Sequence, residues 1–266
     1  VGGVLSPKFN FLPDTSINIS VDYFDIRVKG EVTQLGARTI VFGCYNSDNF
    51  PNDPLCGLFS RGQTAAPNNI AEVRDQFVNI ARQRNSGVDV NVNVRHDLGK
   101  LGRLSLTADM TWQTKRLSQL LPSSPVEDDN GEVGSPRWVG DFRLSWTGTG
   151  GTTLFYGMNV IGGASSLQEF LDRNGDQPCV TTAIRGTYCP KLDTKAVFYH
   201  NASITQEVGD RFEITLGVSN IFDTRPPRVT VANLTQNTVP TLGPVAAVSQ
   251  YGFSGRRGFI NVKSKF

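Results

Sequence analysis

Alternation of apolar and polar residues is the dominant pattern along this chain. In residues 104–112, apolar side chains occupy every second position, and Ser105, Thr107 and Asp109 lie between them. A period of two places the apolar residues on one face of a β-strand and the polar residues on the other. The same alternation, more regular in some segments than in others, recurs in 1–9, 17–28, 88–95, 138–146, 154–162, 196–206, 212–220 and 258–266. The sequence therefore predicts nine strands. It gives no convincing helical period, and 70–84 is ambiguous.

The links between these strands alternate between short and long. The short links are 10–14, 99–102, 148–151 and 209–211, and the long ones are about 34–75, 117–135, 164–194 and 223–250. A compact soluble domain rarely carries four loops of that length. An antiparallel β-barrel with tight turns at one rim and long loops at the other is expected to show this alternation. The predicted class is an all-β, antiparallel transmembrane barrel.

Aromatic residues on the apolar face favour a membrane location. Trp138 and Trp146 share a face eight residues apart, which is about 26 Å along a strand and about 20 Å of height at a tilt of roughly 40°. Phe212 and Phe222, ten residues apart, give about 25 Å by the same estimate. Such spans suit two aromatic girdles around an apolar band. The predicted girdle residues are Trp112, Trp138, Trp146, Phe212, Phe222 and Phe266.

Composition narrows the function classes. Among 266 residues, 26 Lys and Arg against 24 Asp and Glu give a net charge of +2, so no strong field attracts nucleic acid. No apolar run approaches the roughly 18–20 residues of a membrane-spanning helix. The chain begins at Val1 without a signal-like segment, and we expect a mature product or an internal piece of a longer protein.

The four cysteines form two local pairs. Cys44 and Cys56 lie in one long link, and Cys179 and Cys189 lie in another. Four cysteines allow three connectivities, of which two local bridges are the simplest. Four free thiols are the alternative. No Cys-x-x-Cys spacing occurs, which disfavours a zinc site.

Several segments resemble TonB-dependent receptors of the bacterial outer membrane. Residues 258–266 resemble the last strand of outer-membrane barrels, which ends in an aromatic residue. Residues 217–223, followed by Arg-Pro-Pro at 225–227, are similar to the penultimate strand of these receptors, where an Asn-aliphatic-Phe-Asp run leads into the last extracellular loop. Residues 19–26 look like a mid-barrel strand of the family, and so does the loop that holds Cys44, Cys56 and 58–61.

This resemblance implies a 22-stranded barrel with short periplasmic turns, long extracellular loops, an N-terminal plug domain and a TonB-binding segment before the plug. Residues 1–266 then look like the C-terminal part of the barrel, roughly strands fourteen to twenty-two, with plug and TonB segment absent from the chain. Nine lipid-facing strands with two open edges would leave backbone groups without partners in a bilayer. The implied partners are the N-terminal barrel and plug portion, TonB through that portion, outer-membrane lipid and a small-molecule ligand. A small complete barrel with one strand miscounted is the rival.

The resemblance also implies where a ligand binds. The long loops would form an extracellular mouth that captures an iron–siderophore or another scarce nutrient. The candidate ligand-binding residues are aromatic or cationic: Arg38, Phe42, Tyr45, Phe50, Phe59, Arg61, Phe170, Arg173, Arg185 and Tyr188. The opposite strand faces would line the lumen with residues of mixed charge: Asp89, Arg95, Asp109, Asp141, Arg143, Glu213, Lys263 and Lys265.

Enzyme chemistry is not indicated. His96 and His200 lie on separate strands without a nucleophile signature, and no phosphate-binding loop or Gly-x-Ser-x-Gly occurs. Two acidic loop clusters have oxygen ligands of the kind that Ca²⁺ prefers, but a solvated acidic loop is the favoured interpretation of each, and the second cluster lacks the closing Glu of an EF-hand. They are Glu127, Asp128, Asp129, Asn130 and Glu132, and Asp172, Asn174 and Asp176 around Gly175. No resident metal or cofactor is otherwise expected.

Two other functions remain open at the level of sequence. One is a passive porin or small outer-membrane barrel without plug or TonB. The other is a soluble, secreted β-rich binding module, which salt would release from the cell envelope, whereas a barrel needs detergent.

Overall fold

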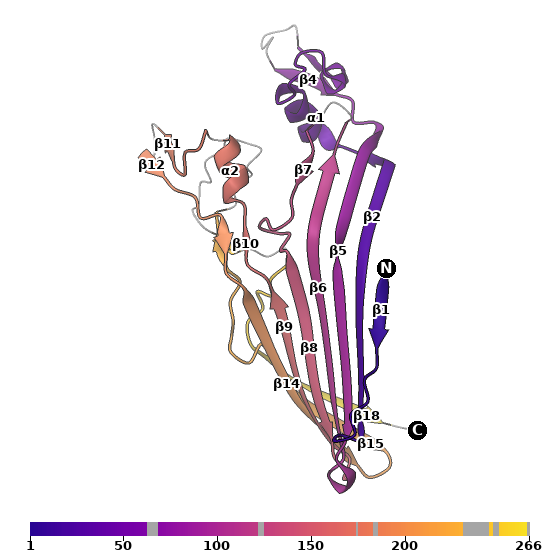
Figure 1. Ribbon diagram of the computed structural model, residues 1–266. Helices are drawn as coiled ribbons and strands as arrows, with labels where there is room; N and C mark the ends of the chain where they lie inside the picture. The colour runs from indigo at the N-terminus through magenta and orange to yellow at the C-terminus, as the bar shows by residue number, and fades with distance from the viewer. Residues whose placement is uncertain are drawn as a thin grey trace. The chain divides into compact units, whose positions relative to one another are not determined.

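The main feature of the protein is one antiparallel sheet with the strand order β1-β2-β5-β6-β8-β9-β14-β15-β18 (Figure 1). The computed structural model describes residues 1–62, 69–121, 125–173, 175–182, 186–230, 245–246 and 250–264. The nine strands are β1 (Gly2–Leu5), β2 (Thr15–Gln34), β5 (Phe77–Asp97), β6 (Arg103–Gln119), β8 (Trp138–Thr147), β9 (Thr152–Ile161), β14 (Val197–Val208), β15 (Phe212–Ser219) and β18 (Arg257–Ser264). The all-β class and the nine predicted strands are confirmed.

Shorter elements occupy the long links. They are α1 (Gly36–Tyr45), η1 (Pro54–Leu58), β3 (Phe59–Arg61), β4 (Ile70–Val73), η2 (Gly99–Leu101), β7 (Glu127–Asp128), β10 (Ala164–Ser165), α2 (Leu167–Arg173), β11 (Val180–Thr182), β12 (Gly186–Tyr188), β13 (Asp193–Thr194), β16 (Arg228–Val229) and β17 (Val245–Ala246). The ambiguous segment 70–84 is β4 followed by the beginning of β5.

Three strands are longer than their alternation predicted. β2, β5 and β6 have 20, 21 and 17 residues. The segment 113–117 of β6 is Gln-Thr-Lys-Arg-Leu and carries no apolar alternation, yet it keeps its place in the strand. Ladder hydrogen bonds between backbones do not require an apolar side chain, so a strand continues beyond the stretch that its hydrophobic pattern reveals.

The chain divides into two compact units. Unit 1 comprises Val1–Phe24, Gly87–Thr114 and Asn130–Phe266, and unit 2 comprises Asp25–Ser86 and Lys115–Asp129. Unit 1 contains the four short turns and most of the sheet. Unit 2 contains the remaining parts of β2, β5 and β6 together with α1, η1, β3, β4 and β7.

The register of unit 1 brings the apolar residues of neighbouring strands onto one face. Leu104 is paired with Trp146, which is paired with Leu154. On the following strands, Ile204 is paired with Leu216, and Leu216 with Ile260. Leu154, Leu216 and Ile260 are 45, 50 and 68% exposed. This exposed apolar face is the expected property of a sheet that contacts lipid.

The predicted girdle stays a prediction, and the register shows where some of its aromatic residues lie. Trp112 is the direct partner of Trp138 on the apolar face, and the indole Nε1 of Trp146 donates to the carbonyl of Leu101 in a short turn at 2.9 Å. The strand-length estimate for Phe212 and Phe222 is wrong, because β15 ends at Ser219 and Phe222 lies in the turn beyond it. Phe266 lies outside the described residues.

An asparagine-centred turn is the reason that β15 stops early. Asn220 and Asp223 both have a φ of 53°, a left-handed conformation that Asn and Asp tolerate better than other side chains. The Asn220 side chain accepts from the Thr224 backbone N–H and donates to the Thr224 carbonyl, at 2.8 and 2.9 Å. Phe222 instead packs its ring edge-on against His200, with centroids 4.9 Å apart.

The two short helices α1 and α2 were not predicted. The buried side of α1 consists of Ile40 and Cys44, four residues apart, which is too brief a pattern to reveal a helix by periodicity. For α2, the signal was Ser166 followed three residues later by Glu169, a capping-box spacing. In the structure, the Ser165 hydroxyl accepts from the Leu167 N–H at 3.3 Å at the beginning of this helix.

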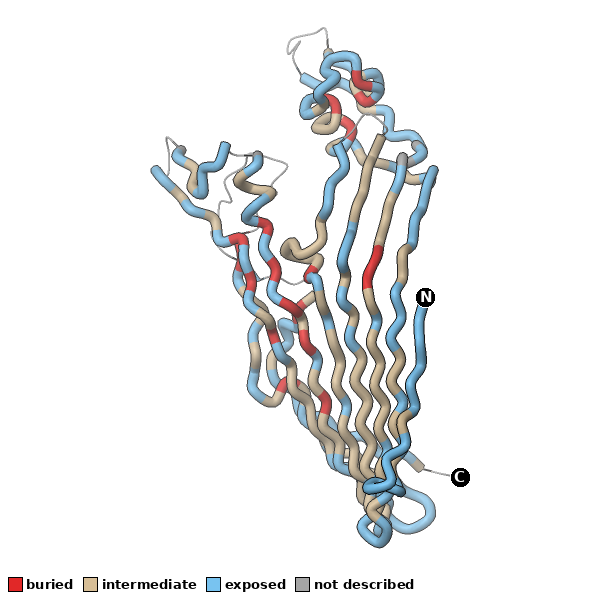
Figure 2. Tube along the Cα trace, in the orientation of Figure 1, coloured by how far each residue is buried: buried red, intermediate tan, exposed pale blue. Residues whose placement is uncertain are grey.

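Among the described residues, buried apolar side chains that pack against one another form two small clusters rather than one core, and Figure 2 shows how little of the chain is buried. One cluster, in unit 1, consists of Val197, Val229 and Tyr251. The other, in unit 2, consists of Ile40, Cys44 and Leu55. Both include residues from the long links, so two of these loops have folded cores of their own.

Among the described residues, no helix has both the length and the apolar composition needed to cross a membrane.

Candidate functional site

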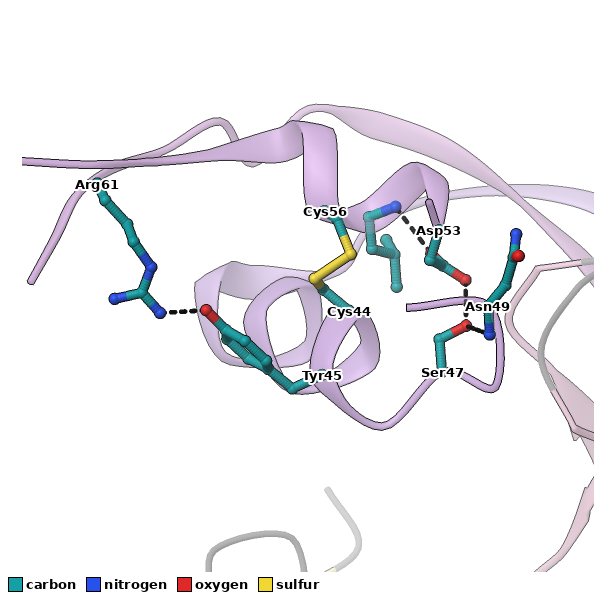
Figure 3. The surroundings of a disulfide bond; sticks show 8 residues. Cys44, Tyr45, Ser47, Asn49, Asp53, Cys56 and Arg61 are labelled. Carbon is teal, nitrogen blue, oxygen red and sulfur yellow. Dashed lines mark hydrogen bonds between the residues drawn. A yellow bond between two sulfur atoms is a disulfide. The ribbon is translucent and has the colours of Figure 1, made fainter. Parts of the chain in front are cut away.

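The loop between β2 and β5 folds into a small disulfide-linked module, which we call the loop module (residues 35–62 and 69–75). The Cys44–Cys56 disulfide joins the end of α1 to η1, as the sequence predicted (Figure 3). Ile40, Cys44 and Leu55 are at most 2% exposed, and Leu58, Phe59 and Val73 pack against them. The module therefore presents a defined surface rather than a flexible loop.

Asp53, which is not among the residues that the sequence pattern indicated, fixes the sharp change of direction in this module. It is 3% exposed, and its carboxylate accepts from the Leu55 N–H at 2.9 Å and from the Ser47 hydroxyl at 2.7 Å (Figure 3). An Asp that precedes a Pro at the first turn of a helix is a recognised N-cap signal, and Asp53-Pro54 carries it. Asp53 thus determines the shape of the loop.

Four predicted ligand-binding residues of the loop module lie together as an aromatic–arginine cluster. The ring of Tyr45 lies 5.3 Å from that of Phe50 and 5.9 Å from that of Phe59. Arg61 donates a hydrogen bond to the Tyr45 hydroxyl, and its guanidinium carbon lies 5.7 Å from the centre of the Tyr45 ring (Figure 3). Tyr45 and Phe50 are 41 and 50% exposed. Exposed rings beside a guanidinium are suited to stack with and hydrogen-bond a flat or anionic ligand.

Arg38 and Phe42 form a second pair in the loop module. They lie one turn apart on α1, and the Arg38 guanidinium carbon is 5.6 Å from the centre of the Phe42 ring. Residues spaced by four on a helix share a face, which explains the contact. Six of the ten predicted residues are therefore in unit 2 and belong to this one module.

The remaining predicted residues belong to unit 1. Phe170 lies in the middle of α2 and is partly buried, and the hydroxyl of Tyr188 in β12 hydrogen-bonds Thr230 at 2.8 Å. Arg173 is the last residue of α2, and Arg185 lies outside the described residues. The predicted Cys179–Cys189 bridge is present at the base of the β11–β12 hairpin.

Three long links of unit 1 are joined in what we call the loop pad (residues 130–135, 164–166, 191–194, 229–230 and 250–251). The Ser165 N–H donates to the Gly131 carbonyl at 2.8 Å, and the Gln250 side-chain amide donates to the Gly134 carbonyl at 2.6 Å. The Thr230 N–H donates to the Lys191 carbonyl at 2.7 Å. Because separate loops share one set of hydrogen bonds and one buried cluster, the pad is a pre-formed surface.

The polar face of the sheet in unit 1 carries a side-chain network across several strands. Arg143 on β8 contacts Asp109 on β6 and makes an ion pair of 2.6 Å with Asp141 on its own strand. Asp141 also accepts from Asn159 on β9, which in turn accepts from Asn201 on β14 at 3.3 Å. The mixed charges that the sequence assigned to this face thus neutralise one another in part.

The other candidate residues have local partners. His96 contacts the Thr15 hydroxyl at 2.7 Å, and His200 contacts the Tyr156 hydroxyl at 2.6 Å. Asp128 of the first acidic cluster accepts from the Arg116 N–H, and Asp172 of the second accepts from Gln168. Within the part of the chain that the structure describes, no three His, Cys, Asp or Glu side chains are grouped to hold a metal ion. Asn174 lies outside that part.

These features define a class: an antiparallel sheet with one apolar and one polar face, whose strands are joined alternately by short turns and by long, structured links, as in outer-membrane transport barrels. Comparison with protein families gives the same class, because the model of the TonB-dependent receptor-like β-barrel matches residues 6–221. The chain belongs to this family. A comparison with curated proteins found no match.

Solved structures of the same family have a similar fold. The ferric enterobactin receptor PfeA from Pseudomonas aeruginosa, a mutant in complex with enterobactin, has a TM-score of 0.58 and 15% identity, covering 100% of this chain and 31% of that one. The pyoverdine outer membrane receptor FpvA from the same organism, bound to pyoverdine, has a TM-score of 0.48 and 14% identity, covering 95% of this chain and 28% of that one. The chain thus spans about three tenths of the length of these receptors.

Proposed function

We propose that this chain is the C-terminal part of the barrel of a TonB-dependent outer-membrane receptor that takes up a scarce small-molecule ligand. The observation that carries the proposal is the family match over residues 6–221, together with a nine-stranded sheet whose fold agrees with part of a siderophore receptor barrel. The rest of the barrel, the plug and TonB are the partners that the proposal requires.

The two open edges of the sheet support the proposal that further strands of a barrel pair with it. β1 and β18 are at the two ends of the strand order, and neither has a second neighbour among the described strands. In a bilayer, the free N–H and C=O groups of both edges need partners. The remaining strands of the barrel would supply them, either from the same polypeptide or from a second chain.

The loop module supports a binding role for the extracellular side. Its aromatic–arginine cluster combines exposed rings with a cation on a surface held by a disulfide and a buried Asp cap. Pre-organised binding surfaces lose less conformational entropy on binding than mobile loops do. An anionic iron–siderophore, with flat chelating groups, has the chemistry that this cluster fits.

Uptake of radioactive iron by cells that produce the full-length receptor tests the proposal. We expect uptake from at least one member of a panel of ferric siderophores, and loss of that uptake in cells without TonB. Replacement of Tyr45 by Ala should weaken binding about tenfold, in line with the 1–2 kcal/mol of an aromatic and cation–π contact. Phe253→Ala, at another exposed aromatic residue, is the matched control. Uptake that is independent of TonB would indicate a passive barrel instead.

A further inference from the structure

An apolar groove lies over the last three strands of the sheet. It has a volume of about 720 Å³, and its lining includes Ala202 and Ile204 of β14, Leu216 and Val218 of β15, and Gly258 of β18. All of these residues lie in unit 1. Arg256, next to the beginning of β18, lines the groove as well.

The side chains of Ala202, Ile204, Leu216 and Val218 belong to the apolar face, whereas Ser203, Gly217 and Phe259, which also line the groove, form the row between them whose side chains are on the polar face. Ala202 is paired with Val218, and Val218 with Gly258, so the three residues form one row across the sheet. Ile204 and Leu216 form the next row along the strands. The Ala202–Val218–Gly258 row has two small residues, whereas Ile204, Leu216 and Val218 are 44, 50 and 37% exposed. A hollow at Ala202 and Gly258, between larger apolar side chains, has the shape and the chemistry of a binding site for a hydrocarbon chain.

Arg256 places a positive charge at the groove. Its backbone N–H donates to the Asp223 carboxylate at 2.9 Å, which holds the beginning of β18 against the Asn220–Thr224 turn. Among the described residues, no hydrogen bond or ion pair involves the Arg256 guanidinium. It lies at the end of the strands from which the long link 220–256 departs, and the long loops of outer-membrane barrels are extracellular.

We propose that this groove binds one phosphate-bearing lipid of the outer leaflet, with an acyl chain along Ala202, Leu216 and Gly258 and the phosphate at Arg256. An apolar face in a membrane contacts hydrocarbon, and a hollow in it is filled by a chain rather than by water. A guanidinium binds a phosphate through paired, charge-assisted hydrogen bonds. The charge of Arg256 therefore selects a lipid with an anionic headgroup over an uncharged lipid with the same chains.

Native mass spectrometry of the full-length receptor in detergent tests this assignment. The two probes are dioleoyl phosphatidate and dioleoylglycerol, which share their acyl chains and differ in the phosphate. We expect one phosphatidate molecule to bind about tenfold more tightly than dioleoylglycerol. Arg256→Gln should abolish this preference, whereas Arg211→Gln, at an exposed arginine in a short turn, should leave it unchanged.

A second variant tests the groove itself. Ala202→Phe fills the hollow and should weaken the binding of both probes, with folding checked by the heat-modifiable mobility of the barrel on a gel. Equal binding of the two probes, or equal losses for the Arg256 and Arg211 variants, would overturn the proposal. The inference requires only the membrane location of the family, so its failure would leave ligand uptake untouched.

Discussion

The ring of Phe259 on β18 lies over Gly217 on β15, on the polar face of the sheet. The two residues are direct partners in the register, and a Cβ placed on Gly217 would be 2.3 Å from the ring. Within β9, the ring of Phe155 lies over Gly157 in a similar way, at 3.0 Å. Glycine inside a strand often marks a close approach of this kind, and here it makes room for an aromatic ring.

Gly217→Val should therefore impair assembly of the barrel. The new side chain would overlap the Phe259 ring, and overpacking of this kind costs about 1–3 kcal/mol. The amount of heat-modifiable receptor in the outer membrane measures the effect. Gly3→Val is the matched control, since no atom lies within 4 Å of a Cβ at Gly3. Addition of Phe259→Ala to Gly217→Val should restore part of the loss, and the absence of any rescue would show that the ring is not the cause.

The assignment of residues to the apolar and polar faces of the sheet predicts that Leu216→Arg lowers the amount of protein in the membrane, whereas Lys263→Gln does not. Leu216 is on the apolar face, where an arginine near the middle of the bilayer costs about 2–4 kcal/mol. Lys263 is on the polar face as the direct partner of Glu213, so its loss should be tolerated. Trp146→Asp should fall between them, because Trp146 lies next to a short turn. Immunoblots of membrane fractions measure the levels, and equal levels for all three variants would contradict the facing.

Asp53→Ala should loosen the loop module without disturbing the sheet. The variant loses the bond to the Leu55 N–H and the bond from the Ser47 hydroxyl, and loss of an N-cap typically costs about 1 kcal/mol. Hydrogen exchange of the backbone amides in η1 should become faster, while exchange in β8 and β9 stays the same. Asp48→Ala, at an exposed position of the same loop, is the control and should leave exchange in η1 unchanged.

Removal of the Cys44–Cys56 disulfide should weaken ligand binding more than barrel stability. The bridge closes a loop with a sequence separation of 12, for which chain entropy predicts about 3 kcal/mol of stabilisation. That stabilisation acts on a module with only three fully buried side chains. A Cys44→Ser, Cys56→Ser variant should still migrate as a folded barrel but, under the proposed function, bind the ligand less tightly. The variant Cys179→Ser, Cys189→Ser, tested in the same way, shows whether removal of the other disulfide has the same effect on ligand binding.

The sheet was predictable because each strand carries its own signal. Alternation is a local property, and hydrogen-bonded neighbours such as Leu104 and Trp146 share a face only if their alternations are in phase. The loops have no such signal. The contact of Tyr45 with Arg61 depends on the path from α1 through η1 to β3, which a buried carboxylate and a disulfide determine. Residue types therefore indicate candidate binding residues in the loops, but not which of these residues are in contact with one another.

Phe222 illustrates the same limit at a strand end. Its spacing from Phe212 suits a continuous strand, but the Asn220 side chain closes a turn on Thr224 and ends the ladder. A turn of this kind depends on one residue and on its backbone angles, so a pattern averaged over ten residues does not detect it.

The loop pad gives this protein a surface that exists only after assembly. The hydrogen bond from Gln250 to the Gly134 carbonyl joins residues 116 positions apart, and four strands of the sheet lie between them in the chain. An antibody raised against the pad would recognise a discontinuous epitope made of three loops, and it would not bind the unfolded polypeptide. Under the proposed function the pad is on the outside of the cell, and such an antibody would report on living cells whether the strands beneath the pad have reached their final register.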